Sequence, residues 1–254
     1  MERSELWQLQ QNKLDGTIPP SLCLIGDSLT DFLTLNHNKL TGRIPECFGT
    51  SFPALPTMQL QDNSLTGGLP QTWSPTNALN SLMVSNNPDL GGKLPDSLFK
   101  MSDLRAVIAE GSGLKGSLPL ELCNATNLES LYLASNEIHG ELPLCITNLT
   151  NLKELSAPFN NIEGTIPTSL DKMVSLKQFD LSSVSLLSEG PYSPEVARTQ
   201  EQASCPHILR TNSFSFVSKP LTVRCIHPAR TTSRARSPMP WATCRRSSRW
   251  PSST

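Results

Sequence analysis

Apolar residues recur in a fixed frame along residues 5–187, and the frame repeats every 24–26 residues. Each unit contains an L-x-L pattern, such as Leu131 and Leu133, that ends three residues before an asparagine or its substitute. Alternation of apolar and polar positions predicts a short strand with one buried face. One unit cannot bury that face alone, so we expect successive units to stack around a shared core.

A second pattern follows each predicted strand and reads asparagine, apolar residue, glycine, then Ile-Pro or Leu-Pro. An asparagine amide both donates and accepts hydrogen bonds, so a stack of asparagines can satisfy the backbone groups at the strand ends. Ser112 replaces the asparagine in the fifth unit and can supply one hydroxyl bond, whereas Val184 in the eighth unit can supply none. The predicted ladder consists of Asn12, Asn38, Asn63, Asn87, Asn136 and Asn160.

The combined pattern LxxLxLxxNxLxGxIP resembles the leucine-rich repeat, in the extracellular subtype known from plants and also found in algae and other protists. The resemblance covers residues 5–187 and implies an α/β repeat solenoid. Such a solenoid is a curved, right-handed superhelix with about eight parallel strands on its concave face. Its convex side is expected to be mostly irregular or 3-10 helical.

The repeat is lost after Leu187, and residues 188–254 form a basic tail rich in serine, proline and arginine. The overall net charge of -1 hides an acidic excess before the tail and a basic excess within it. The sequence leaves three explanations open: disorder, a gene-model artefact such as a shifted reading frame, or a basic arm for nucleic acid. We favour the first two and expect no nucleic-acid partner. The first unit begins within a repeat and no cap precedes Glu5, which predicts a piece of a longer protein.

Four of the seven cysteines occupy matching positions in the repeat. Cys23 and Cys47 lie one unit apart on the outer arc, and Cys123 and Cys145 hold the same positions in later units. Their spacing predicts the disulfides Cys23–Cys47 and Cys123–Cys145. The alternative is that each cysteine is a small buried apolar residue. Disulfides would place the domain in an oxidising compartment.

Two sequons, at Asn124 and Asn148, match the acceptor pattern for N-glycosylation. Both fall on the predicted convex side, although segments such as NLTNL are also common filler in this repeat. By resemblance we expect an extracellular or cell-surface location. No apolar run is long enough for a membrane span, and the first residues lack the apolar core of a secretory signal.

Motifs for catalysis or cofactor binding are missing from the sequence. There is no phosphate-binding loop, dinucleotide fingerprint, zinc-protease motif or nucleophile elbow. None of the four histidines stands at a spacing from serine or cysteine that indicates a nucleophile. We therefore expect no enzyme activity, no cofactor and no metal.

Binding is the alternative to catalysis, and the strand residues between the leucines point to the concave face. Exposed apolar side chains among polar ones favour a protein or peptide partner, while amides also suit a glycan. Each of these residues could equally be neutral filler on a solvated sheet. The candidate ligand-binding residues are Gln59, Gln61, Met83, Ser85, Ile108, Tyr132, Ser156 and Phe159, which lies beside the last asparagine.

The function predicted from the sequence is non-catalytic recognition, resembling the ligand-binding ectodomain of a cell-surface receptor-like protein. A secreted inhibitor similar to polygalacturonase inhibitors is an alternative from another class. A fragment of a receptor-like kinase, whose kinase domain is absent from this chain, is a more distant one. The sequence does not indicate the ligand's identity or the oligomeric state.

Overall fold

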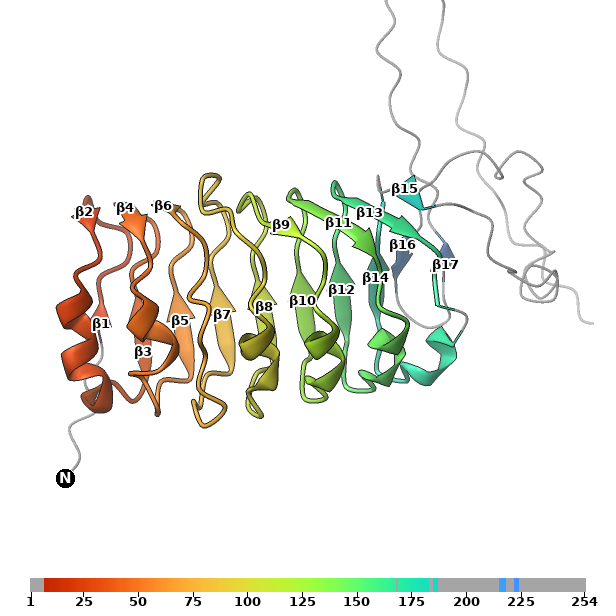
Figure 1. Cartoon of the computed structure of the whole chain (residues 1–254), viewed down its shortest axis with the longest axis horizontal. Coiled ribbons are helices and arrows are strands. Elements are labelled where there is room, and N and C mark those ends of the chain that lie inside the picture. The colour runs from red at the N-terminus through yellow and green to blue at the C-terminus, as the bar shows by residue number, and fades with distance from the viewer. Residues whose placement is uncertain (1–6, 168, 183–184, 187–214, 218–221, 224–254) are drawn as a thin grey trace, which may run out of the picture.

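The inner sheet of the solenoid is a row of eight parallel strands, seen edge to edge in Figure 1. The computed structural model describes residues 7–167, 169–182, 185–186, 215–217 and 222–223. Each strand pairs with the strand one repeat before it and the strand one repeat after it. The strands are β1 (Trp7–Gln8), β3 (Phe32–Thr34), β5 (Thr57–Gln59), β7 (Ser81–Met83), β8 (Ala106–Ile108), β10 (Ser130–Tyr132), β12 (Glu154–Ser156) and β14 (Gln178–Asp180).

The sheet exists because the middle residue of each strand is buried in one continuous apolar core. Leu82 pairs with Met58 on one side and Val107 on the other, and Leu131 continues the same row. All four side chains are at most 1 % exposed. The flanking strand residues face away from this core and are mostly half-buried. This arrangement confirms the predicted leucine-rich repeat solenoid with parallel strands.

The convex side is built from short 3-10 helices, as predicted, and no described residue lies in an α-helix. Most of these turns begin directly after the proline of the repeat, which fixes the backbone torsion there. None of the helices in the described part of the chain has the length and apolarity required to cross a membrane. The 3-10 helices are η1 (Pro20–Ser28), η2 (Glu46–Gly49), η3 (Asp96–Lys100), η4 (Leu120–Asn124), η5 (Leu144–Asn148) and η6 (Leu170–Lys172).

Two smaller parallel sheets follow the asparagines, along the upper edge of the molecule in Figure 1. They were not predicted from the sequence. The fourth repeat is one residue longer and separates them, leaving an isolated bridge between Lys93 and Lys115. One sheet contains β2 (Asp15–Thr17), β4 (Lys39–Arg43) and β6 (Ser64–Thr66), and the other contains β9 (Lys115–Gly116), β11 (Glu137–Glu141), β13 (Asn161–Gly164) and β15 (Ser185–Leu186).

The ladder asparagines join neighbouring repeats through both ends of their amides. The Nδ2 of Asn87 donates to the carbonyl oxygens of Val84 in its own repeat and Leu60 in the preceding one, at 2.9 and 3.1 Å. Its Oδ1 accepts the backbone N–H of Leu65, at 3.0 Å. The same arrangement recurs at Asn38, Asn63, Asn136 and Asn160. Asn12 is exposed, and its amide donates to the carbonyl oxygens of Leu9 and Gln10 in its own repeat.

The serine in the fifth repeat keeps the bond to the preceding repeat but has no amide oxygen to accept a second one. The Ser112 hydroxyl donates to the carbonyl oxygen of Val84 in the preceding repeat, at 3.0 Å. The backbone N–H of Ser112 donates to Oδ1 of Asn136, which also accepts from Leu114. The ladder therefore stays connected through this repeat by a hydroxyl and a shared amide oxygen. Val184 lies outside the described residues.

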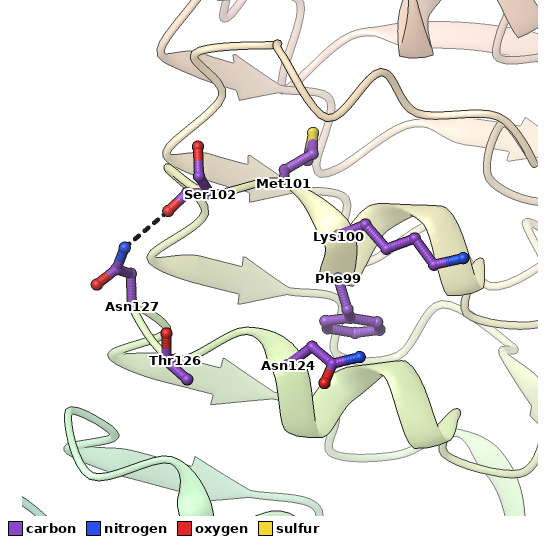
Figure 2. Close-up of a pocket in the computed structure, with 7 residues that line it drawn as sticks. All are labelled: Phe99, Lys100, Met101, Ser102, Asn124, Thr126 and Asn127. Carbon is purple, nitrogen blue, oxygen red and sulfur yellow. Dashed lines mark hydrogen bonds between the residues drawn. The ribbon is translucent and has the colours of Figure 1, made fainter.

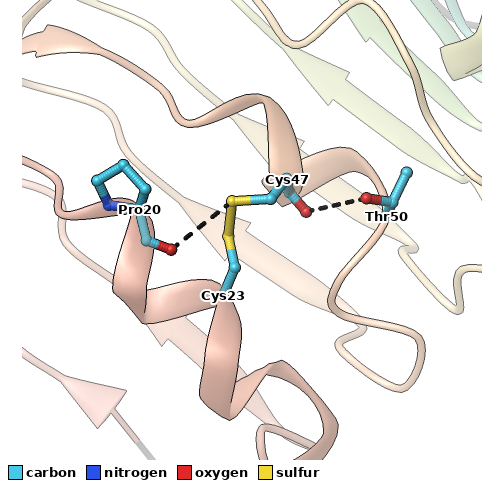
Figure 3. Close-up of a disulfide and its surroundings, with 4 residues drawn as sticks. All are labelled: Pro20, Cys23, Cys47 and Thr50. Carbon is cyan, nitrogen blue, oxygen red and sulfur yellow. Dashed lines mark hydrogen bonds between the residues drawn. A yellow bond between two sulfur atoms is a disulfide. The ribbon is translucent and has the colours of Figure 1, made fainter.

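Two disulfides link adjacent 3-10 helices on the convex side. Cys23 and Cys47 connect η1 with η2, and their Cα atoms are 6.1 Å apart. Cys123 and Cys145 connect η4 with η5 across a Cα separation of 5.6 Å. Figure 3 shows the first bridge, where the Thr50 hydroxyl donates to the carbonyl oxygen of Cys47. These are the pairs that the repeat positions predict.

Two short strands lie within residues 188–254 and extend the inner sheet. β16 (Ser215–Val217) pairs antiparallel with β14, and β17 (Thr222–Val223) pairs antiparallel with β16. The last parallel strand leaves backbone donors and acceptors free at its outer edge, and β16 hydrogen-bonds to them. The alternating sequence SFSFV around β16 is suited to such pairing. The remaining residues of the predicted tail, 188–214, 218–221 and 224–254, lie outside the described residues, as do residues 5 and 6.

The ladder yields a test of how neighbouring repeats are held together. Substitution Asn87→Ala leaves one backbone N–H and three carbonyl oxygens, those of Leu60, Val84 and Ser85, without their amide partner. We expect the free energy of unfolding to fall by about 2–4 kcal/mol, measured by urea denaturation. The exposed Asn12→Ala is the matched control, with an expected change of less than about 1 kcal/mol. Equal effects at the two positions would contradict a role for buried amides.

The disulfides yield a second test, by alkylation and peptide mass mapping of the full chain. Without reductant, Cys23, Cys47, Cys123 and Cys145 should resist iodoacetamide, and each predicted pair should appear as one linked peptide. With reductant, all four should be alkylated. Free thiols at these four positions in protein purified under oxidising conditions would contradict the pairing.

Candidate functional site

The candidate site is the concave face, defined as the side chains of the inner sheet that point away from the core between β3 and β14. Strand register brings five predicted residues into one row across this face. Consecutive Cα partners link Gln59, Met83, Ile108, Tyr132 and Ser156. Ser156 is buried, whereas the other four are half-buried and leave part of each side chain accessible. The row is polar at its ends and apolar or aromatic at its centre.

A second row lies two residues further along each strand and contains Gln61 and Ser85. The Ser85 hydroxyl oxygen accepts the backbone N–H of Glu110, at 2.9 Å. The Oε1 atom of Gln61 is buried and has no hydrogen-bond partner, and the same is true of Oδ1 of Asn36 in the preceding repeat. This row therefore contains acceptors that the domain itself does not satisfy.

Phe159 lies apart from both rows, at the turn between β12 and the ladder. Its side chain is 62 % exposed, and its φ of 56° places it in the left-handed region. A bulky residue is uncommon there, because its Cβ crowds the backbone. Phe159 thus stands at the rim of the concave face rather than on it.

The same left-handed turn recurs immediately before each ladder residue and forms a row along this rim. Two of its members are joined to a third: His37 Nδ1 lies 3.2 Å from Asp62 Oδ2, and Asn86 Nδ2 donates to Asp62 Oδ1 at 2.7 Å. The row was not predicted from the sequence, because the residue types share no obvious property. Its members are Gln11, His37, Asp62, Asn86, Gly111, Ser135 and Phe159.

Tyr132 is fixed at the centre of the face by a carboxylate. Its hydroxyl donates to Oε2 of Glu154 on the neighbouring strand, and the Ser130 hydroxyl donates to the same oxygen at 3.3 Å. Partial burial, the hydrogen bond to Glu154 and the negative charges of Glu154 and Glu110 raise the pKa of Tyr132 to about 12. Tyr132 therefore remains neutral and available as an apolar ring at physiological pH.

Charged residues form a separate line at the opposite rim, where the strands begin. Glu129 accepts hydrogen bonds from Arg105 Nη1, at 3.1 Å, and from Lys153 Nζ. These two bonds are the main reason that the pKa of the Glu129 carboxyl lies below its ordinary value of 4.5. Arg105 and Lys153 are thus already paired within the domain, and Lys177 occupies the same rim position before β14.

Glu154 and Ser130 were missed as site residues. They lie six residues before the ladder position, outside the L-x-L segment, whereas the predicted candidates lie between or after its leucines. The signal was available, since Ser130 and Glu154 are separated by one repeat and pair in register. What the sequence could not show is that the Tyr132 hydroxyl reaches across to the next strand.

The convex side has a pocket of about 360 Å³ between the fourth and fifth repeats, shown in Figure 2. One of its walls is held by the Asn127 side chain, whose Nδ2 donates to the carbonyl oxygen of Ser102 at 2.8 Å. The sequon residue Asn124 borders the pocket, while Asn148 occupies the same position one repeat later, and both are exposed. The lining residues are Phe99, Lys100, Met101, Ser102, Asn124, Thr126 and Asn127.

Within the described part of the chain, no three histidine, cysteine, aspartate or glutamate side chains gather in a way that could hold a metal ion. The concave face offers hydrogen bonds, carboxylates and an apolar centre. These groups can bind a partner by surface complementarity.

A family model described as Leucine Rich Repeat matches residues 31–51 and 127–149. A receptor protein kinase-like protein of Arabidopsis thaliana is 36 % identical over 92 residues, which make up 36 % of this chain and 12 % of that protein. The chain therefore spans about one eighth of the length of this relative.

Two solved structures share the fold over most of this chain. The plant peptide hormone receptor RGFR1 in complex with RGF2 matches with a TM-score of 0.62 and 27 % identity, covering 72 % of this chain and 29 % of that one. The Arabidopsis receptor kinase HAESA, in complex with the peptide hormone IDA and the co-receptor SERK1, matches with a TM-score of 0.63 and 30 % identity. That match covers 70 % of this chain and 30 % of the HAESA chain.

The tyrosine at the centre of the face yields a pH-dependent prediction. Because its folded-state pKa is raised from 10.0 to about 12, its contribution to stability is complete below pH 10 and is lost as the pH rises toward 12. We expect Tyr132 to ionise near pH 12, measured by tyrosinate absorbance after rapid pH jumps. A Tyr192→Phe background removes the only other tyrosine. Glu154→Gln should lower the midpoint, and an unchanged midpoint would contradict the assigned partner.

Proposed function

Because this chain is a leucine-rich repeat protein similar to the ectodomains of plant receptor-like proteins, we propose that it is a non-catalytic recognition domain. Its ligand is a peptide, or an extended segment of a protein, held on the concave face.

The observation that carries this proposal is the apolar centre of the concave face. Met83, Ile108 and Tyr132 lie on adjacent strands in direct register and are only half-buried. Partly accessible apolar side chains surrounded by polar ones are typical of protein-binding surfaces. The names of the two similar structures describe receptors with bound peptide hormones, which supports a peptide as the ligand class.

An extracellular setting is part of the same proposal. Two disulfides join adjacent turns of the convex side, and such bonds persist in oxidising compartments. The sequon residues Asn124 and Asn148 are exposed on this side, so glycans attached there would leave the concave face open. Glycans on the convex side are therefore compatible with ligand binding by the inner sheet.

The test begins with a displayed library of random twelve-residue peptides, selected against the full chain. Each selected peptide is then measured by fluorescence anisotropy against a triple variant carrying Met83→Ser, Ile108→Ser and Tyr132→Ser. We expect the dissociation constant to rise at least about tenfold, because the three changes remove the apolar contact area.

The control replaces three apolar residues that are more exposed but lie outside the concave face. Leu120, Leu144 and Val174 are 71, 68 and 63 % exposed. Their simultaneous change to serine should leave peptide affinity unaltered, and circular dichroism should show both variants folded. If no selected peptide distinguishes the two variants, the concave face is not the binding surface and the proposal fails.

A further inference from the structure

We infer that the concave face selects a ligand that donates hydrogen bonds and is positively charged, that is, a basic peptide segment. This inference rests on the proposed function and adds the chemical class of the peptide. Two independent features of the face support it: the ionisable groups are all acidic, and two buried side-chain oxygens have no hydrogen-bond partner.

The charges of the concave face are all negative. Its three ionisable carboxyl groups belong to Glu110, Glu154 and Asp180, on or next to β8, β12 and β14. No lysine or arginine occupies the outward-facing positions of the described strands from β3 to β14. The cations Arg105, Lys153 and Lys177 lie at the rim, directly before the strands, and the first two are bonded to Glu129. A cationic ligand therefore meets uncompensated negative charge, whereas an anionic one is repelled.

The second feature lies at the other end of the face. Asn36 is only 6 % exposed, yet its Oδ1 has no hydrogen-bond partner, and Oε1 of Gln61 in the next repeat is also buried without one. In contrast, the neighbouring Thr34 hydroxyl donates to Gln10 Oε1 at 2.7 Å. Leaving a buried acceptor unsatisfied is costly. A ligand that supplies a donor therefore gains free energy here when its binding turns either amide oxygen toward the face. Ammonium, guanidinium and peptide N–H groups all meet this need.

The distance between the unpartnered acceptors and the carboxylates matches the length of a short extended peptide. β3 and β8 are separated by three strand intervals, or roughly 14 Å, which four to five extended residues span. Met83 and Ile108 lie between the acceptors and the carboxylates and provide apolar contact for the intervening residues. Beyond them, the Tyr132 ring lies beside Glu154 and can contact a basic side chain bound there.

The experiment uses the peptides selected against the full chain and first compares their composition with that of the unselected library. Peptides whose binding requires the concave face should be enriched in lysine and arginine. Changing those residues to glutamine should weaken binding at least about tenfold. Affinity should also fall as sodium chloride rises from about 0.05 to about 0.5 M, since salt screens exposed charge pairs.

Substitutions in the protein test the carboxylates and amide oxygens that the basic peptides are expected to contact. Glu154→Gln combined with Glu110→Gln should weaken the basic peptides about tenfold and reduce the salt dependence. Glu121→Gln, on the convex side, is the matched control and should have no effect. Gln61→Leu removes an unsatisfied acceptor, so it should weaken peptide binding several-fold without lowering the melting temperature. A purely structural role for Gln61 predicts the reverse.

Two results would overturn the inference, and only the first of them leaves the proposed function intact. One is the selection of neutral or acidic peptides whose binding still requires Met83, Ile108 and Tyr132. The other concerns the basic segment at residues 224–254. If concave-dependent peptides are obtained only after its arginines are changed to glutamine, the chain's own tail occupies the face, and the assignment of a separate ligand is wrong.

Discussion

The buried amide ladder is the interaction on which the rest of this structure depends. A parallel strand of three residues forms few backbone bonds, and its end must turn sharply toward the outer arc. Each buried asparagine satisfies the groups at that turn and, through Nδ2 and Oδ1, ties one repeat to the preceding one. Apolar burial supplies the driving force for stacking, but the amides fix the register in which repeats stack. The concave face is a consequence of that register, because it aligns equivalent positions of every repeat.

Much of the fold was predictable from the sequence, because a repeat constrains the same position several times. The alternating pair Leu131 and Leu133 predicted a strand. The same pattern in the other repeats predicted a parallel sheet, which the structure confirms. The outer sheets were not predicted, since segments such as Lys39–Arg43 carry no alternating apolar pattern beyond one leucine. Their pairing follows from the stacking itself, which brings equivalent segments within hydrogen-bonding distance. β16 was missed for a related reason, since its pairing depends on the free edge of β14.

For the candidate site, the sequence predicts which single residues face the concave side, but not the contacts between their side chains. Met83, Ile108 and Tyr132 each lie four residues before their ladder residue, so the sequence predicts that they share one row on the concave face. The bond between Tyr132 and Glu154 does not, since it depends on side-chain length and rotamer across two strands. The unpartnered oxygens of Asn36 and Gln61 are likewise invisible in the sequence, which predicts a concave-face position for Gln61 but not the burial of its side-chain oxygen. The identity of the ligand-binding residues remains a prediction.

The longer fourth repeat has a consequence for how the solenoid comes apart. Repeats in a linear array communicate only with their neighbours, so cooperativity depends on every interface along the row. Around Asn87 the outer strands give way to isolated contacts, such as the backbone bond from Gly68 N–H to the Leu90 carbonyl and the bridge between Lys93 and Lys115. The two disulfides lie on either side of this point and cross-link neither of its interfaces. Only the inner sheet and the Asn87 bonds carry regular pairing through this repeat, so we expect the array to separate here first, into a front and a rear block, under mechanical load or mild denaturant.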